Sequence, residues 1–246
     1  MGLGRDRLKA IATSEGKMTI PILINSRDRL TWTRELAEWC RELPAARVIV
    51  CDNDSSYPPL LEWLDKLERT PGETIEVVRF GENAGPRGPW RVPLGDAEYF
   101  IVTDPDLDMA GIPKDVLEKL RWSLDEYPEL VKSGLAIRID DLPQTPIADL
   151  ARSTEARFWF PDKGFEAAGC QWFHADIDTT FAMYRNGRGP VGCYHPALRL
   201  AGDYQCRHLP WYVNDSLTEE ERYYLDHINA SLGLFYSPKI RDLTNA

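Results

Sequence analysis

Apolar residues in the first 140 positions fall into short runs, separated by segments in which apolar residues recur every three or four positions. The short runs have the length and the β-branched content of buried strands; they are 19–24, 47–51, 74–80, 98–103 and 131–139. The spacing between them predicts helices over 28–43, after Pro58 and after Pro113. The connection from the third to the fourth run, GENAGPRGPWR, reads as a loop. This alternation predicts βαβ units and a largely parallel sheet.

The pattern loosens after about residue 140. Residues 141–177 mix Pro, Gly, charged and aromatic residues without a clear period, a strand is expected again at 178–185, and a polar helix start at 218–221. No repeat or low-complexity segment interrupts the chain. We therefore expect an N-terminal tail over 1–18, a sheet-forming half over 19–140, and a second half over 141–246 that lies as an appended lobe at the rim of the same domain.

Composition narrows the classes of protein that fit. The chain has 246 residues, 43% of them hydrophobic, enough to bury one substantial core. A net charge of −10 argues against a general nucleic-acid binder, which would carry a basic excess. No apolar run approaches the length of a transmembrane helix. Five scattered cysteines without a CxxC pair indicate neither a zinc knuckle nor a disulfide framework, so a cytoplasmic location is the default expectation.

The run at 98–103 ends in three aspartates at alternate positions, Asp104, Asp106 and Asp108. Carboxylates spaced in this way at a strand end can present oxygens to Mg²⁺ or Mn²⁺. They can equally cap a turn before the helix expected after Pro113, because Asp and Pro dominate turns. Repulsion among three carboxylates costs stability unless a cation is present, which favours a metal site.

Other polar residues are expected near the same edge, because ligands of parallel sheets bind outside the carboxyl ends of the strands. Asn25 and Arg27 end the first strand, and Asp52 ends the second. Asp52 can accept a hydrogen bond from a nucleotide, or it can form an Asx turn. Arg87 and Arg91, in the Gly/Pro loop, can grip a phosphate in fork geometry; a solvated surface loop explains them equally well.

Together these features resemble a GT-A glycosyltransferase of the family-2 type. The likeness is carried by TIPILINSRDRL, by VIVCDNDSS, by the Asn83-Ala84-Gly85 loop and by the DxD motif Asp104-Pro105-Asp106. It covers about residues 19–140, with weaker likeness over 178–212. It implies a Rossmann-like α/β fold with a mostly parallel central sheet, a nucleotide-sugar-binding half at 19–140 and an acceptor-binding half at 141–246. Asp54, where such enzymes often have Gly, and the Pro-rich loop over 86–93 depart from the family pattern.

The resemblance also implies roles for individual residues at the donor site. Asp52 would contact the base, Asp104 would lie near the ribose or the metal, and Asp106 would ligate a Mn²⁺ or Mg²⁺ that bridges the diphosphate. A register of Asp106-Leu107-Asp108 is the alternative. His208 would be a third metal ligand, although packing is the commoner role of such a histidine. The remaining donor-site residues would be Asn25, Arg27, Asn83, Arg87 and Arg91.

In inverting members of the family, a carboxylate in the second half deprotonates the acceptor hydroxyl. Asp203 is the candidate base here and Asp178 is the reserve, while a structural cap is an equally common role for either. Four residues are candidates for the acceptor side: Asp140, Asp141, Trp211 and Tyr212. Turn capping for the two aspartates and core packing for the two aromatic residues are the alternatives.

The function implied is metal-dependent transfer of a sugar from a nucleotide-diphosphate donor, UDP being the commonest in the family, to an acceptor hydroxyl. Direct displacement with inversion is expected; retention becomes the better mechanism if His208 binds the metal and no base exists. The acceptor is a glycan, a protein, a modified nucleic-acid base or a lipid-linked sugar. The alternatives are a sugar-phosphate nucleotidyltransferase, which would usually carry a Gly-rich basic loop where NSRDRL stands, and a non-catalytic nucleotide- or glycan-binding module of the same fold.

Overall fold

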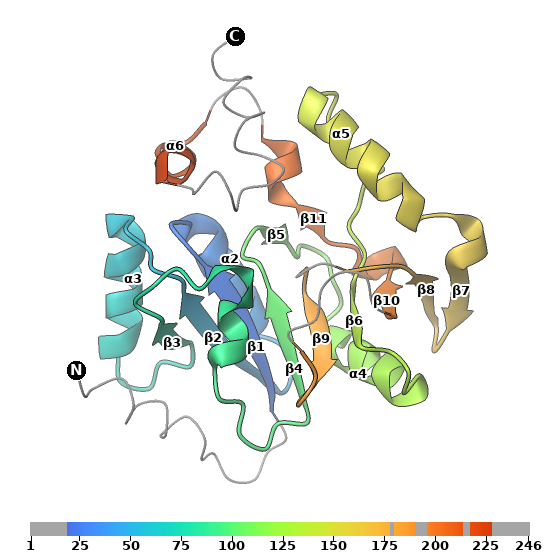
Figure 1. The fold of residues 1–246 in the computed structure, drawn as a ribbon, viewed down its shortest axis with the longest axis horizontal. Coiled ribbons are helices and arrows are strands. Elements are labelled where there is room, and N and C mark those ends of the chain that lie inside the picture. Colours follow the sequence, from blue (N-terminus) through green and yellow to red (C-terminus); the bar gives the residue numbers. More distant parts are fainter. Residues whose placement is uncertain (1–18, 178–179, 190–195, 214–216, 228–246) are drawn as a thin grey trace.

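The computed structural model describes residues 19–177, 180–189, 196–213 and 217–227 (Figure 1). Within these ranges, nine strands form one sheet in the order β3-β2-β1-β4-β9-β6-β10-β8-β7. Their bounds are β1 Ile20–Ser26, β2 Ala46–Asp52, β3 Glu76–Arg79, β4 Tyr99–Thr103, β6 Lys132–Leu135, β7 Gly164–Ala167, β8 Cys170–His174, β9 Ala182–Arg185 and β10 Ala197–Leu200. All of them except β8 and β9 run in the same direction. The expected α/β class, with a mostly parallel central sheet, is confirmed.

Five α-helices accompany the sheet in the described ranges: α2 Leu30–Arg41, α3 Pro58–Arg69, α4 Val116–Glu126, α5 Pro146–Glu155 and α6 Glu219–His227. Successive strand residues point to opposite faces. Ile22 and Ile24 accordingly pack in the larger core, with the buried leucines of α2, α3 and α4, whereas Leu23 packs in a smaller core on the other face. None of the described helices has the length and apolarity needed to cross a bilayer.

The first four strands, and α2, α3 and α4, lie within a few residues of their expected positions. The connection between β3 and β4 was expected to be a loop; it forms a 3-10 helix over Gly85–Arg91. β6 ends at Leu135, earlier than the expected strand over 131–139. Residues 178–179, at the start of the strand expected at 178–185, lie outside the described ranges, and β9 begins at Ala182.

Residues 141–177 were expected to be irregular, and the structure corrects this expectation. α5 starts at Pro146, and its first turn is capped by the Thr145 hydroxyl, which accepts a hydrogen bond from the Ala148 amide. β7 and β8 form an antiparallel pair whose turn places Ala168 and Gly169 at φ angles of 50° and 72°. Gly169 adopts this left-handed conformation without strain because it has no Cβ, whereas Ala168 adopts it at some cost.

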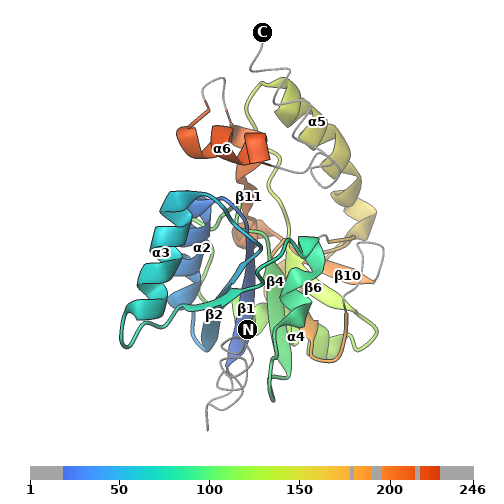
Figure 2. The same ribbon diagram turned by 60° about the vertical axis from the view of Figure 1, so that its left-hand side comes forward.

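The register of the sheet brings the ends of β2, β1 and β4 to one edge. Ser26 lies opposite Asp52, and Ile24 lies opposite Thr103. A further two-stranded pairing, of β5 (Leu107–Asp108) with β11 (Arg207–His208), follows directly after this edge. Figures 1 and 2 show α5 and α6 beyond the same edge, on the side to which the β4 arrow points.

Asp28 ties the loop after β1 to the start of α3. Its carboxylate is buried, and its Oδ1 accepts hydrogen bonds from the amides of Ser56, at 2.6 Å, and Tyr57, at 2.8 Å. These amides precede Pro58, the first residue of α3, so Asp28 caps a helix from a distant loop. Its own amide donates to the Ser55 hydroxyl at 3.1 Å.

We expect Asp28→Ala to lower the free energy of unfolding by about 2–3 kcal/mol, because two amide hydrogen bonds to a buried carboxylate are lost. Asp28 has a φ of 51°, and Asn tolerates this conformation while keeping an acceptor, so Asp28→Asn is expected to cost less. Urea unfolding measures both, with the exposed Asp96→Ala as control. Equal stability of Asp28→Ala and wild type would contradict the capping role.

Candidate functional site

Asp106 and His208 are brought together by the pairing of β5 with β11. His208 lies opposite Leu107, and the amide of Leu209 donates to the Asp106 carbonyl at 2.9 Å. As a result, Nε2 of His208 is 3.5 Å from Oδ2 of Asp106, and the two side chains are 17% and 19% exposed. Two residues that the sequence assigned to a metal site therefore lie side by side in the structure.

The Asp106 carboxylate is held in its ionised form. Burial by itself would raise the pKa of Asp106, but the His208 imidazole and the positive charge of Arg29 lower it, and the balance places this pKa below its ordinary value. Oδ1 of Asp106 is buried and has no hydrogen-bond partner among the residues that the structure describes. A buried charged oxygen without a partner is costly, so it is available to a ligand.

These groups fit a cation that shares its ligands with a bound molecule. In the described part of the chain, no three His, Cys, Asp or Glu side chains are positioned to hold a metal ion by themselves. Mg²⁺ in phosphate sites is typically held by one or two carboxylates, with phosphate and water oxygens completing the shell, and Mn²⁺ prefers the same oxygen ligands. Asp106 and the half-buried Asp104 supply that kind of donor set.

Asp108 is engaged elsewhere. Its Oδ1 accepts a hydrogen bond from the Ala110 amide at 2.9 Å, and its Oδ2 is 3.3 Å from Nη1 of Arg207. The first contact is the turn-capping role that was the alternative for these aspartates, and the second is an ion pair. Both oxygens of Asp108 are therefore engaged within the protein.

Asp141 and Tyr212 belong to a network around Arg207. Oδ2 of Asp141 is 2.6 Å from Nε of Arg207, and Oδ1 accepts a hydrogen bond from the Tyr212 hydroxyl at 2.6 Å. Asp140 remains exposed, with Oδ1 3.7 Å from Nε of Arg138.

Trp211 is buried and packs edge-on against the His208 ring, with centroids 4.8 Å apart. Trp211 thus packs against the site and helps to orient His208.

At the ends of β1 and β2, the polar residues divide into satisfied and unsatisfied groups. Oδ1 of Asp52 accepts a hydrogen bond from the Ser55 amide at 3.1 Å, so this oxygen is used within the loop after β2. By contrast, Oδ1 of Asn25 and Nε of Arg27 are buried without a hydrogen-bond partner among the described residues. Nε of Arg27 is 3.7 Å from the Asp28 carboxylate, a longer ion-pair contact.

The loop over 83–91 is held by Asn53, to which the sequence assigned no specific role. Asn53 is buried; its Oδ1 accepts from the Ala84 amide at 2.7 Å and its Nδ2 donates to the Gly85 carbonyl at 3.1 Å. Asn83 is exposed and accepts from the Gly85 amide at 3.0 Å. Arg87 is exposed, and Arg91 is paired with Glu82, as expected of a surface loop.

Of the two candidate bases, Asp203 belongs to the described part of the chain. Asp203 lies in a 3-10 turn over Gly202–Tyr204, just after the carboxyl end of β10. Its side chain is exposed, and it forms no hydrogen bond or ion pair with the described residues. Asp178 lies outside the described ranges.

Two further residues near Asp106 were not identified from the sequence. The guanidinium carbon of Arg29 lies 4.1 Å from the Trp32 ring centroid and 3.8 Å from the Tyr224 ring centroid. The only sequence signal near Tyr224 was the helix start expected at 218–221. Nothing in that pattern indicates that α6 reaches the strand ends.

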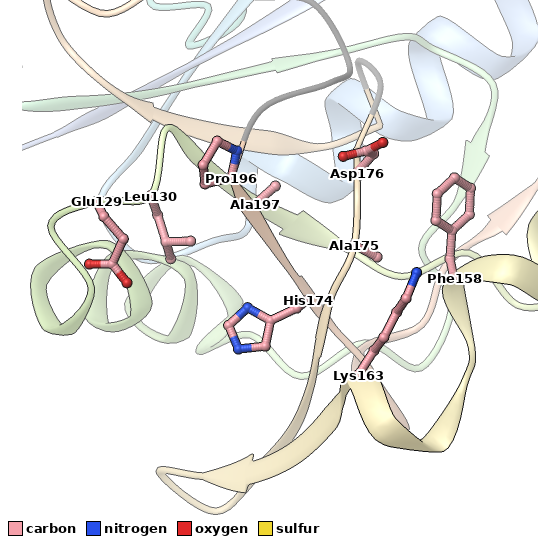
Figure 3. A pocket seen from close by; sticks show the side chains of 9 residues that line it. All are labelled: Glu129, Leu130, Phe158, Lys163, His174, Ala175, Asp176, Pro196 and Ala197. Carbon is pink, nitrogen blue, oxygen red and sulfur yellow. The ribbon is translucent and has the colours of Figure 1, made fainter.

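A cavity of about 510 Å³ lies at the other end of the sheet (Figure 3). Leu130, just before β6, and Ala197, the first residue of β10, line it, which places it at the amino ends of these parallel strands. The side chains of His174 and Lys163 reach into it in Figure 3. It contains none of the predicted site residues, so the strand-end site is a separate feature.

No protein family model matches the chain, and no curated protein matches it. The chain is similar to several solved structures, including the following three. Mannosyltransferase PcManGT from Pyrobaculum calidifontis, in complex with GDP-Man and Mn²⁺, is 15% identical, with 97% of this chain and 79% of that chain covered and a TM-score of 0.48.

S. aureus TarS 1-349 is 15% identical, covering 68% of this chain and 47% of that one, with a TM-score of 0.42. Its complex with UDP-GlcNAc is 17% identical, with 68% and 45% covered and a TM-score of 0.44. The chain therefore spans about half the length of TarS 1-349. All three TM-scores lie below 0.5, so these similarities do not by themselves assign an activity.

The Asp141 network predicts a pH-dependent contribution to stability. Burial tends to raise the pKa of Asp141, but the Tyr212 hydroxyl and the Arg207 guanidinium lower it below the ordinary 3.8. A carboxylate with a lowered folded-state pKa stabilises the fold above its unfolded-state pKa, and this contribution is lost as the pH falls through the folded-state value. Asp141→Asn should therefore lower the free energy of unfolding at pH 7 by about 0.5–1 kcal/mol, since the pair is partly exposed.

Urea unfolding between pH 3 and pH 7 measures this difference. The penalty of Asp141→Asn is expected to shrink once the pH is below 3.8. Asp140→Asn is the matched control, because that side chain is 78% exposed, and it should stay within about 0.5 kcal/mol of wild type. A penalty for Asp141→Asn that does not vary with pH would contradict the assignment.

Proposed function

We propose that this protein is a metal-dependent glycosyltransferase that moves a sugar from a nucleotide-diphosphate donor to an acceptor hydroxyl. The observation that carries the proposal is the Asp106 carboxylate. It is ionised, it has one buried oxygen without a hydrogen-bond partner among the described residues, and it faces His208 at the end of β4. The resemblance of the surrounding segments to GT-A glycosyltransferases supports the same conclusion, and UDP is our first choice of donor nucleotide.

The donor would lie across the ends of β2, β1 and β4. Asp104 and Asp106, with His208 as a third ligand, would hold Mn²⁺ or Mg²⁺, and such an ion offsets charge that builds on a departing diphosphate. The unsatisfied groups of Asn25 and Arg27 are available to the nucleoside and its phosphates. Asp52 would meet the base with the oxygen that does not accept from Ser55.

In the transfer step, Asp203 would accept the proton of the acceptor hydroxyl. The oxygen attacks the anomeric carbon in line with the bond to the diphosphate, so the new glycosidic bond forms as the carbon–phosphate-oxygen bond breaks, and the configuration inverts. The exposed carboxylate of Asp203, at the carboxyl end of β10, supports this assignment.

The candidates for contacts with the acceptor are Tyr212 and Asp140, which is exposed on the same half of the chain. The acceptor classes proposed are a glycan, a protein, a modified nucleic-acid base or a lipid-linked sugar.

A sugar-phosphate nucleotidyltransferase is the second candidate, because it would use a similar sheet and a carboxylate-bound metal. Such an enzyme usually has a Gly-rich basic loop after the first strand. Here residues 26–29 enter α2 directly, and the buried Asp28 in this turn is committed to capping α3. Release of free nucleoside diphosphate, rather than pyrophosphate, would distinguish sugar transfer from nucleotidyl transfer, and release of neither would favour a binding module.

Nucleotide binding is expected to require metal and Asp106 together. Melting curves with UDP, GDP, CMP or dTDP, each with and without Mn²⁺, should show one nucleotide that stabilises the protein only when the metal is present. At a hundred times its dissociation constant it would add about 2.7 kcal/mol. Asp106→Ala should abolish this gain, whereas Asp108→Ala should lower the basal stability and keep the gain. Stabilisation by none of these nucleotides would contradict the proposal.

Removal of the base is expected to slow transfer without weakening donor binding. Asp203→Asn should reduce kcat by about 10²–10⁴-fold, the range typical of general-base catalysis, and leave the metal-dependent nucleotide stabilisation unchanged. The exposed Asp162→Asn is the matched control. Release of nucleoside diphosphate from the donor in the presence of acceptor measures both. A loss of less than about tenfold would rule out Asp203 as the base.

A further inference from the structure

α6 (Glu219–His227) is anchored to the start of α2 and to the loop that follows β2. The Glu220 carboxylate accepts hydrogen bonds from the Thr31 amide, at 3.1 Å, and from the Thr31 hydroxyl, at 2.9 Å. Thr31 lies in the first turn of α2, so Glu220 supplies the negative charge that a helix N-terminus favours. The hydroxyls of Tyr223 and Ser56 are 3.1 Å apart. Figures 1 and 2 both show α6 next to the upper ends of α2 and α3.

Tyr224, the next residue along α6, brings an aromatic ring over the same edge. The Arg29 guanidinium lies between two rings, 3.8 Å from the Tyr224 centroid and 4.1 Å from the Trp32 centroid. Stacking of this kind attracts the cation and restricts the side chain to few rotamers.

Both residues lie at the edge of the sheet where β1 and β4 end. Ile24 lies opposite Thr103, so the loop after β1 that contains Arg29 adjoins the segment that follows β4. Burial raises the pKa of the Tyr224 hydroxyl; the charge of Arg29 opposes this shift, and the negative charges of Asp106 and Asp104 add to it. The charge of Arg29 in turn contributes to the lowered pKa of Asp106. If Asp106 held a metal ion, a guanidinium at this edge of the sheet would be placed to meet the oxygens of a phosphate bound to that ion.

We propose that α6 completes the donor site, and that Arg29 and Tyr224 position the diphosphate of a nucleotide sugar bound at Asp106. This inference rests on the proposed function and extends it to Arg29, a residue of the TIPILINSRDRL segment that was given no role from the sequence, and to Tyr224, which lies outside the motifs that carry the family resemblance. Arg29 offers its planar fork of N–H donors to the phosphate oxygens. Tyr224 holds that fork in place through its ring and covers the site from the solvent side.

The contacts that hold α6 in place lead to an expected effect of donor binding on this helix. The helix spans nine residues, and Leu225 is its buried residue among those described. A helix this short is marginal in isolation, so its docking depends on the contacts of Glu220, Tyr223 and Tyr224 with the strand-end loops. A ligand that engages Arg29 adds to those contacts, and bound donor should therefore protect the α6 amides from hydrogen exchange.

Calorimetric titration tests the inference with UDP, GDP, CDP and dTDP in the presence of Mn²⁺. For the nucleotide that binds wild type, Arg29→Lys and Tyr224→Ala should each weaken binding about tenfold or more, since a charge-assisted contact is lost or loosened. Affinity for the matching nucleoside monophosphate should change less than about threefold, because the inferred contact is to the diphosphate. Arg222→Ala, on the exposed side of α6, is the matched control.

The outcomes separate this inference from the function on which it rests. Wild type that binds none of the four diphosphates contradicts the proposed function and this inference together. Wild type that binds one of them, while Arg29→Lys and Tyr224→Ala bind it equally well, contradicts this inference alone. An equal loss for monophosphate and diphosphate also overturns it, because that result indicates general damage to the site. Circular dichroism confirms that each variant is folded before its affinity is compared.

Discussion

The short antiparallel pairing of β5 with β11 holds the candidate site together. A pairing of two residues on each strand is weak in isolation, but three contacts reinforce it: the Leu209 amide on the Asp106 carbonyl, the Arg207–Asp108 ion pair and the Arg207–Asp141 ion pair. Because of this pairing, His208, in the segment after β10, lies next to the Asp106 carboxylate, which follows β4. The lowered pKa of Asp106 depends on this contact.

Around this pairing, some polar side chains at the edge of the sheet are hydrogen-bonded within the protein, and others have buried atoms without a hydrogen-bond partner among the described residues. Asp28 and Asn53 use their hydrogen-bonding groups to fix the loops after β1 and β3. Buried polar groups are normally paired, yet Asn25, Arg27 and Asp106 each keep one buried atom without a hydrogen-bond partner in the described ranges. Such groups at the carboxyl ends of adjacent parallel strands are the arrangement expected where a polar ligand binds.

The parts of the structure that depend on local sequence could be predicted. Runs of apolar residues specify β1 to β4 because each strand is buried, and alternate residues fill the two cores. Asp104 and Asp106, the proposed metal ligands, could be picked out because they directly follow such a run. α5 and the β7–β8 pair were missed, since a ten-residue helix and two short strands leave little periodicity to detect.

Non-local contacts account for what the sequence could not predict at the site. Arg207 contacts both Asp108 and Asp141, and Tyr212 also contacts Asp141. These contacts depend on the β5–β11 pairing rather than on residues that are neighbours in the sequence. His208 was found only through the family resemblance. The Arg29–Tyr224 contact could not be foreseen, because it depends on where a helix near the C-terminal end of the described chain docks.

The central claim is that the end of β4 binds a divalent metal together with a nucleoside diphosphate. A crystal of the protein grown with Mn²⁺ and the stabilising nucleoside diphosphate tests it most directly, by anomalous diffraction from the manganese. The account predicts a peak within coordination distance of the Asp106 carboxylate, about 2.0–2.2 Å from its oxygen, with the diphosphate completing the shell. A peak at another place, or a nucleotide bound away from the ends of β1 and β4, would contradict it.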